Sequence, residues 1–236
     1  MHAEEALTYP GSSPPNILIN DQVVLSYRLP SATIAASFTD GDRDMILERG
    51  MELPDGRVIF WMEDFCITCV PSQDKRWYVG HFDRAEYESR WENTVALLKD
   101  EKFQFMVKVG RGFSVRARCV SVNGTFVFSV HRDPDATMAA IIVLNAQQKE
   151  VFKLTTTTHL TSCSLSEFAE YLALSFYGVL SDKEPYGNKL EVFNLKTGEV
   201  VASIDKDNDL RHAEIIVTEP DGNVVAFYKG KSFKVC

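Results

Sequence analysis

Cys66 and Cys69 have the spacing of cysteine pairs that bind zinc or exchange disulfides. Both chemistries need the two sulfur atoms on one side of a turn or of a helix N-terminus. The apolar and β-branched residues around this pair favour a strand, in which side chains three positions apart face opposite ways. No second pair of cysteine or histidine residues follows at zinc-finger spacing. We therefore expect structural thiols here, with no metal and no cofactor.

Asp40, Asp42 and Asp44 alternate along the chain, as the first ligands of a calcium-binding loop do. Such a loop also needs a glycine at its sixth position and a glutamate at its twelfth. Met45 and Met51 occupy these two positions. The segment is therefore expected to be a solvated loop.

His159 and Cys163 would share one face of a strand, which is an arrangement suited to a thiol nucleophile and its base. The sequence offers no third group that could be assigned to orient the histidine. We expect His159 to tie strands together, and we expect no catalytic residue in the chain.

A basic stretch interleaved with aromatic residues spans residues 103–118. Its candidate partner-binding members are Lys108, Arg111, Phe113, Arg116 and Arg118, and they follow Phe103 and Phe105. Basic residues beside stacking aromatic side chains are also typical of RNA recognition. We expect a basic edge or a docking site for an acidic partner, with RNA binding as the alternative.

Composition narrows the class of protein. The chain has 236 residues, 45% of them hydrophobic, which is enough for a substantial core, and a net charge of −8 that works against general binding to nucleic acid or anionic membrane. The five cysteines are scattered among apolar segments, as is typical of reduced thiols. The N-terminus is acidic where a secretory signal is basic, and the longest apolar run, residues 138–144, cannot span a bilayer. We expect a cytoplasmic or nuclear protein without membrane contact.

The elements that position these residues recur along the chain. Residues 143–152 and 192–201 align without gaps, 49 positions apart, and both are typical of strand, polar turn and strand. A third copy lies at residues 29–34 and a looser fourth at 67–79. The chain therefore repeats one kind of β-hairpin.

A second kind of hairpin alternates with the first. It consists of a polar turn followed by β-branched and aromatic residues, and its copies lie at residues 54–60, 122–128, 169–174 and 220–227. Asp-Gly or Asn-Gly marks most of these turns, because such residues tolerate positive φ. Four strands in a unit of about 40 to 50 residues are typical of a propeller blade.

The segment from His159 to Ile204 resembles a blade of the WD40 family. His159 stands near the place of the family's Gly-His dipeptide, residues 166–169 occupy its Ser-Pro-Asp-Gly turn, and residues 192–195 replace its Trp-Asp strand. Residues 212–227 resemble the first half of another blade. The resemblance implies a WD40-like β-propeller, a rigid ring that presents many loops.

The expected fold is all-β: one domain over residues 1–236, forming a small propeller of about five blades. The chain begins with a hairpin that lacks its inner pair and ends after about three strands of a blade. We therefore expect strands from the two termini to complete one blade, which removes two exposed sheet edges.

One stretch interrupts the repeat, because Gly56 and Gly124 are 68 residues apart. Within this stretch, four apolar residues are spaced as they would be on one face of a helix: Tyr87, Trp91, Val95 and Leu98. Asp83 can cap such a helix at its N-terminus. We expect an inserted helix over residues 83–99 that covers a blade edge or docks a partner through Tyr87 and Trp91.

These features favour a non-enzymatic scaffold that binds a protein partner through propeller loops. One alternative is a propeller that binds or cleaves glycans, which needs aromatic residues and paired carboxylates on one face. Such enzymes are usually exported, and the reduced cysteines oppose that location. The other alternative is RNA binding through residues 108–118, which predicts a steep dependence on salt.

Overall fold

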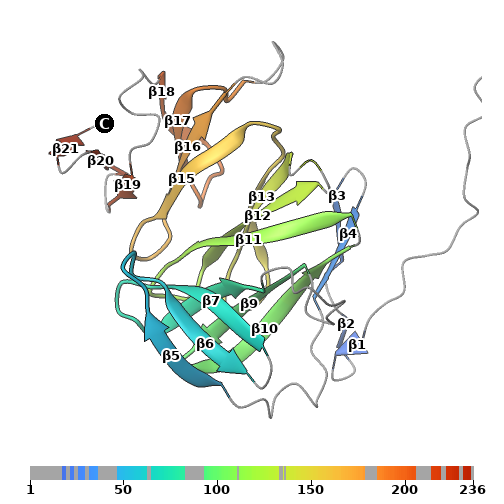
Figure 1. The fold of residues 1–236 in the computed structure, drawn as a ribbon. Helices are drawn as coiled ribbons and strands as arrows, with labels where there is room; N and C mark the ends of the chain where they lie inside the picture. The colour runs from blue at the N-terminus through green and yellow to red at the C-terminus, as the bar shows by residue number, and fades with distance from the viewer. Residues whose placement is uncertain are drawn as a thin grey trace, which may run out of the picture.

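The computed structural model describes the residue ranges 47–62, 65–82, 93–110, 112–132, 135, 137–178, 185–205, 214–218 and 222–228, and the backbone of strands at 18–19, 22–23, 26–29, 32–36 and 231–234. Within these ranges every regular element is a β-strand and none is a helix. Figure 1 shows these strands gathered into several twisted sheets. The prediction of an all-β fold is therefore confirmed.

Two four-stranded antiparallel sheets follow one another along the chain (Figure 1). The first consists of β11 (Phe113–Val120), β12 (Phe126–Arg132), β13 (Met138–Leu144) and β14 (Glu150–Leu154). The second consists of β15 (His159–Leu165), β16 (Tyr171–Tyr177), β17 (Lys189–Asn194) and β18 (Val200–Asp205). Both sheets are simple meanders, since neighbouring strands are consecutive in sequence.

The 49-residue repeat corresponds to the outer hairpins of these two sheets. β13 pairs with β14 in the first sheet, and β17 pairs with β18 in the second. The backbone N–H of Asn145 binds the carbonyl of Lys149, whereas that of Asn194 binds the carbonyl of Glu199. The later turn is thus one residue longer, but the equivalence of the two hairpins is confirmed.

The largest sheet has eight strands. Their order is β3 (Ser26–Leu29), β4 (Ala32–Ala36), β10 (Lys102–Val109), β9 (Thr94–Lys99), β8 (Trp77–His81), β7 (Phe65–Pro71), β6 (Val58–Met62) and β5 (Glu48–Glu52). Its central strands β7 to β10 form a meander like the two sheets above. β7 and β8 pack against β11, just as β15 and β16 pack against β19 (Glu214–Val217). The meander β7 to β10 therefore occupies the place of a blade.

This arrangement corrects the assignment of residues 67–79 to the outer kind of hairpin. β7 pairs with β8 as the inner hairpin of its meander, in the place that β11 and β12 take in the next sheet. The turn at residues 72–75 has no glycine, which is the signal that marks most other inner turns in the sequence. The described part of the stretch between Gly56 and Gly124 therefore contains the meander of β7 to β10, in the place of a blade.

The predicted helix over residues 83–99 is wrong in the part that the structure describes. Thr94–Lys99 is strand β9, and Asp100 and Glu101, with φ of 48° and 64°, connect it to β10 in a two-residue turn. Every side chain from Thr94 to Leu98 is buried. A strand buried on both faces is a continuous apolar run, which spacing alone cannot distinguish from a helix. Tyr87 and Trp91 lie outside the described residues.

The last sheet contains β19, β20 (Val224–Tyr228) and β21 (Lys231–Lys234). Near the N-terminus, β1 (Leu18–Ile19) pairs with β2 (Gln22–Val23), and β3 and β4 join the eight-stranded sheet beside β10. Among the described residues, no pairing links these first strands to β19, β20 or β21. Closure of the ring and the number of blades stay predictions.

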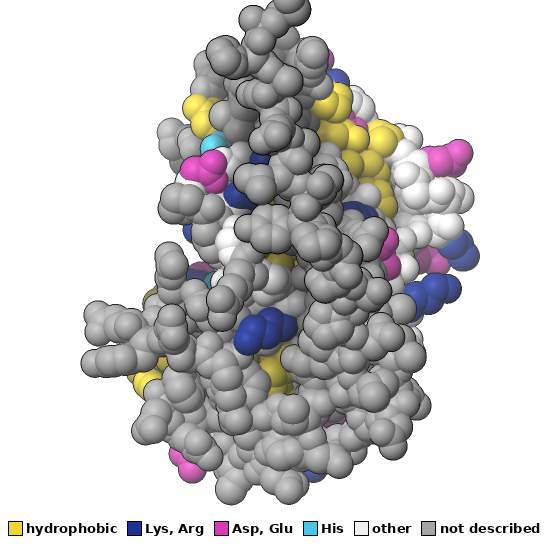
Figure 2. Space-filling view, turned by 90° about the vertical axis from the view of Figure 1, so that its right-hand side faces the viewer, with side chains coloured by type: hydrophobic (Ala, Val, Ile, Leu, Met, Phe, Trp, Pro, Cys, Tyr) yellow, Lys and Arg dark blue, Asp and Glu magenta, His cyan; other side chains and the backbone are white. Residues whose placement is uncertain are grey.

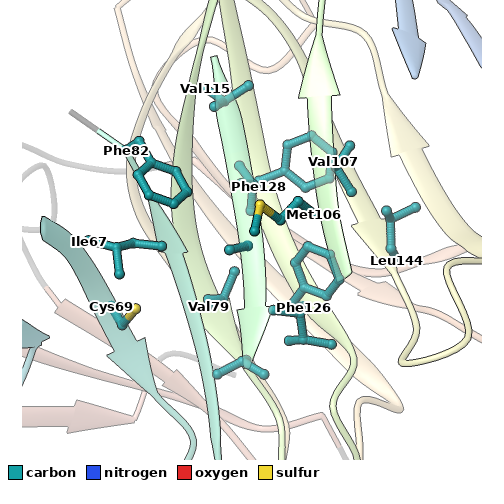
Figure 3. Packing of buried hydrophobic residues seen from close by; sticks show 14 of the residues in the cluster. Ile67, Cys69, Val79, Phe82, Met106, Val107, Val115, Phe126, Phe128 and Leu144 are labelled. Carbon is teal, nitrogen blue, oxygen red and sulfur yellow. The ribbon is translucent and has the colours of Figure 1, made fainter. Parts of the chain in front are cut away.

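Hydrophobic residues fill the space between successive sheets. The largest cluster joins the strands from β6 to β13, and Figure 3 shows side chains such as Met106, Phe126 and Phe128 packed within it. The Phe126 ring lies 5.7 Å from the Phe105 ring and 5.9 Å from the Phe128 ring, centroid to centroid. A second cluster lies between the sheets of β11 to β14 and β15 to β18, and a third joins the latter to β19 and β20. Face-to-face packing of successive sheets is the packing of propeller blades.

Candidate functional site

Four turns of common construction close the inner hairpins of successive sheets. Each begins with a hydroxyl residue whose carbonyl accepts a hydrogen bond from the N–H of a residue with positive φ. The pairs are Ser72 with Lys75 (2.9 Å), Ser121 with Gly124 (3.1 Å), Ser166 with Ala169 (2.9 Å), and Thr218 with Gly222 (3.0 Å). This series could have been found in the sequence by aligning Ser72-x-Asp74 with Ser121-x-Asn123, exactly one 49-residue repeat apart.

The four hydroxyl groups bind within their own turns. The Oγ of Ser72 accepts from the Trp77 N–H at 3.0 Å, and the Oγ of Ser166 accepts from the Tyr171 N–H at 2.9 Å. The Ser121 hydroxyl donates to Asn123 Oδ1 at 2.6 Å, and the Thr218 hydroxyl donates to the Asn223 carbonyl at 3.3 Å. These hydroxyls fix the shape of the turns.

Lys75→Gly is expected to stabilise the protein, by about 0.5–1 kcal/mol, because lysine is strained in the left-handed region. Lys75 has φ of 54°, and among the described residues its side chain makes an exposed ion pair with Glu52 at 3.2 Å and no other polar contact. Lys75→Ala is the matched control, since it removes the ion pair and keeps the strain. Urea unfolding measures both variants, and equal stabilities for Gly and Ala would contradict the strained turn.

The turns of successive sheets also bind one another. The N–H of Val122 donates to the carbonyl of Glu167 at 3.1 Å, and Asn123 Nδ2 donates to the carbonyl of Phe168 at 2.6 Å. A Cβ added to Gly124 would lie 2.8 Å from the Trp77 ring, so this ring packs directly over the next turn. Tyr171 covers Gly222 in the same way, also at 2.8 Å. The turns therefore form a rigid rim.

A cavity of about 520 Å³ opens between these turns. Its lining comes from four successive sheets and consists of Gln73, residues 120–122, residues 165–167 and residues 216–218. Apart from its hydroxyl residues, the lining consists mainly of aliphatic side chains, and Ile216 is 44% exposed. Phe168, next to the lining, is 56% exposed. The cavity thus combines a rigid polar rim with an apolar floor.

The charge at this cavity is acidic. Glu167 is the charged residue of its lining, it is exposed, and no described side chain pairs with it. The nearby cations are neutralised, since Lys75 pairs with Glu52 at 3.2 Å and Arg76 pairs with Asp100 at 3.1 Å. The Arg76 guanidinium lowers the pKa of Asp100, and Asp100 raises the pKa of Arg76. A group that enters the cavity therefore meets a carboxylate with which no described cation pairs.

The described members of the predicted basic stretch do not share one exposed surface. Phe113 is buried in the core at 6% exposure, and Lys108 is half-buried. Arg118 turns inward and donates from Nε to Ser129 Oγ at 2.9 Å, while Arg116 is exposed. Arg111, Tyr87 and Trp91 lie outside the described residues. On the face drawn in Figure 2, described Lys and Arg side chains are interspersed with Asp and Glu. Partner binding by these residues stays a prediction.

A β-bulge explains why Arg118 points inward. The register of β11 against β12 shifts between Ala117 and Cys119, so Arg118 is the extra residue of the bulge. Burial lowers the pKa of Arg118, and no described carboxylate lies within ion-pair distance of it. Ser129 also contacts His131 Nε2 at 2.9 Å, so the guanidinium ends a buried polar chain.

In each candidate pair of cysteine and histidine residues, the strand that carries the pair places its two members in different surroundings. Cys66 is exposed and Cys69 is buried, as expected for residues three apart in a strand, and burial raises the pKa of Cys69. The register of β15 shifts between Leu160 and Ser162. This bulge puts His159 in solvent while Cys163 packs against the core, so the two do not form a nucleophile and base. The aspartates at 40–44 lie outside the described residues.

Metal-ligand clusters and membrane-spanning helices are both absent from the described residues. No three or more His, Cys, Asp or Glu side chains there lie close enough together to hold a metal ion. No helix in the described part of the chain is long and apolar enough to cross a bilayer.

Comparisons with known proteins find similarity at the level of solved structures. No protein-family model matches the sequence, and no curated protein matches it. The β-propeller domain of Myceliophteria thermophila Cps50 (Swd1) is similar at 12% identity and a TM-score of 0.47, over 86% of this chain and 64% of that one. The RRP9 WD40 repeats match at 10% identity and a TM-score of 0.45, over 79% of this chain and 56% of that one.

KlAtg21, in a complex with the coiled coil of AgAtg16, matches at 10% identity and a TM-score of 0.49, over 90% of this chain and 62% of that one. This chain thus spans less than two thirds of each of these three structures. All three are WD40 β-propeller proteins, which is the class that the sequence resembles.

Proposed function

We propose that this chain is a non-enzymatic scaffold that binds a protein partner at the cavity between its inner turns. The observation that carries the proposal is the cavity itself, of about 520 Å³, built by equivalent turns of four successive sheets. Its volume is in the range of pockets that bind ligands, roughly 300–1,000 Å³. Hydrogen bonds within and between the turns hold it open, so binding needs little reorganisation.

The partner's chemistry follows from the lining. Aliphatic side chains and the exposed Ile216 favour an apolar side chain, which loses water on entry. Glu167, with which no described side chain pairs, favours a lysine or arginine beside it. An extended peptide segment with one apolar and one basic side chain meets both demands.

Selection from a random peptide display library tests this proposal. The enriched peptides are expected to combine an apolar residue with a lysine or arginine. Ile216→Asp and Glu167→Lys should each weaken the binding of an enriched peptide, by about tenfold or more, because they remove the apolar and the acidic contact. Added salt should weaken the wild type and not Glu167→Lys.

Val201→Asp is the matched control for Ile216→Asp. Val201 is 51% exposed on β18, outside the cavity lining, and its variant should keep full affinity. Equal losses in both variants, or peptides that bind Ile216→Asp normally, would contradict a site at the cavity. Binding of a single-stranded RNA oligonucleotide that Arg116→Glu abolishes and Glu167→Lys preserves would instead favour the RNA alternative.

A further inference from the structure

Two cysteines on neighbouring inner strands lie in direct contact. The Sγ atoms of Cys119 on β11 and Cys163 on β15 are 3.3 Å apart. β11 and β15 belong to different sheets, and both thiols are half-buried against the hydrophobic cluster between these sheets. The two residues are 44 positions apart in sequence, so only the packing of the sheets brings the sulfur atoms together.

We propose that Cys119 and Cys163 form a reversible disulfide when the protein meets a peroxide, and that this bond joins the two sheets covalently. A disulfide requires the sulfur atoms to approach to about 2.05 Å. At 3.3 Å, the two Sγ atoms are already close to the distance at which this bond forms.

The surroundings of the two sulfur atoms can support a thiolate. The hydrogen bond to Cys163 and burial hold the pKa of Cys119 well above its usual value. The guanidinium of Arg118, next to Cys119 in sequence, interacts electrostatically with both sulfur atoms and has no described carboxylate partner. A buried cation beside a sulfur supports the negative charge of an attacking thiolate. Arg118 is therefore a positioning residue for whichever of the two sulfur atoms reacts first.

The reaction balances with hydrogen peroxide as the oxidant. One of the two sulfur atoms, having lost its proton, attacks one peroxide oxygen, the O–O bond breaks, and the released hydroxide takes up a proton to leave as water. The other sulfur then attacks the sulfenic acid, the S–O bond breaks, and the proton of this second thiol leaves with the hydroxide as a second water. The sulfur pair loses two electrons and the peroxide gains them.

The bond would tie together two turns of the rim. Cys119 lies two residues before Ser121, and Cys163 lies three residues before Ser166, so both sulfur atoms are close to the ends of their inner strands. Closing a long loop restricts the unfolded chain and stabilises the fold. We expect the melting temperature to rise on oxidation, by roughly 5–10 °C, and to fall back after reduction with dithiothreitol.

Peptide mapping of the full chain after hydrogen peroxide treatment tests the proposal. Without reduction, a cross-linked pair of peptides containing Cys119 and Cys163 is expected, and reduction should separate it. Cys119→Ser and Cys163→Ser should each abolish the cross-link and the rise in melting temperature. Cys66→Ser, which removes an exposed thiol elsewhere, is the matched control and should keep both.

Arg118→Met tests the positioning role through a rate. It should slow formation of the cross-link, by about tenfold, while the final yield of disulfide stays the same. The proposal is overturned if Cys119 and Cys163 remain alkylatable at a peroxide dose that fully oxidises Cys66. It is also overturned if Cys163 pairs with another cysteine. Neither outcome depends on whether the cavity binds a peptide.

Discussion

Gly124→Ala is expected to lower the free energy of unfolding, by about 3 kcal/mol, through a backbone and a packing penalty. Gly124 has φ of 81°, a conformation that costs alanine roughly 1–2 kcal/mol. The new Cβ would also lie 2.8 Å from the Trp77 ring, and overpacking of this kind costs about 1–3 kcal/mol. Urea unfolding followed by tryptophan fluorescence measures the loss.

Gly198→Ala separates the two penalties. Gly198 has φ of 76°, but a Cβ there meets no atom within 4 Å, so only the backbone penalty of about 1–2 kcal/mol applies. Gly222→Ala should resemble Gly124→Ala, because its Cβ would lie 2.8 Å from the Tyr171 ring. If Gly124→Ala and Gly198→Ala lose equal stability, the Trp77 ring does not pack over the turn of the next sheet.

The sequence predicts those parts of the fold that local chemistry determines. Asn123-Gly124 and Asp221-Gly222 indicate turns because they tolerate positive φ, and Gly124 and Gly222 both have positive φ in the structure. The turn at Ser72 is predicted as the polar turn within residues 67–79, but its equivalence to these two inner turns escapes prediction because Lys75 adopts positive φ without being a residue that favours it. The hydrogen bonds of Ser72 with Lys75 and Trp77 hold this conformation against the preference of lysine.

Other features depend on contacts that no local pattern encodes. β9 is buried on both faces through its packing in the core, so its spacing fits a helix equally well. The bulge at Arg118 reverses the direction of one side chain and thereby removes it from the predicted basic surface. Counting the basic residues of the sequence cannot detect a shift of one residue in strand register.

The cavity and the cysteine contact also depend on residues that are distant in sequence. Gln73 and Glu167 come from two turns and Ile216 from strand β19, all far apart in sequence, and none of them is distinctive in its local sequence. Cys119 and Cys163 likewise give no signal, since their spacing matches no metal or redox motif. Both arrangements follow once the inner strands are placed side by side, so a repeat register based on Ser72, Ser121 and Ser166 is the step that would have predicted them.

Phe126→Ala is expected to lower the free energy of unfolding, by about 3–5 kcal/mol, because it leaves a cavity in the core shared by two sheets. Phe126 is fully buried on β12, and its ring contacts Phe105 on β10 as well as Phe128. Hydrogen exchange should therefore accelerate together in the meander of β7 to β10 and in the sheet of β11 to β14. Phe168→Ala, at a site 56% exposed, is the control and should change stability little, by about 0.5 kcal/mol or less. If the meander of β7 to β10 keeps its protection while β11 to β14 lose theirs, the two sheets unfold independently, and the prediction of one domain over residues 1–236 fails.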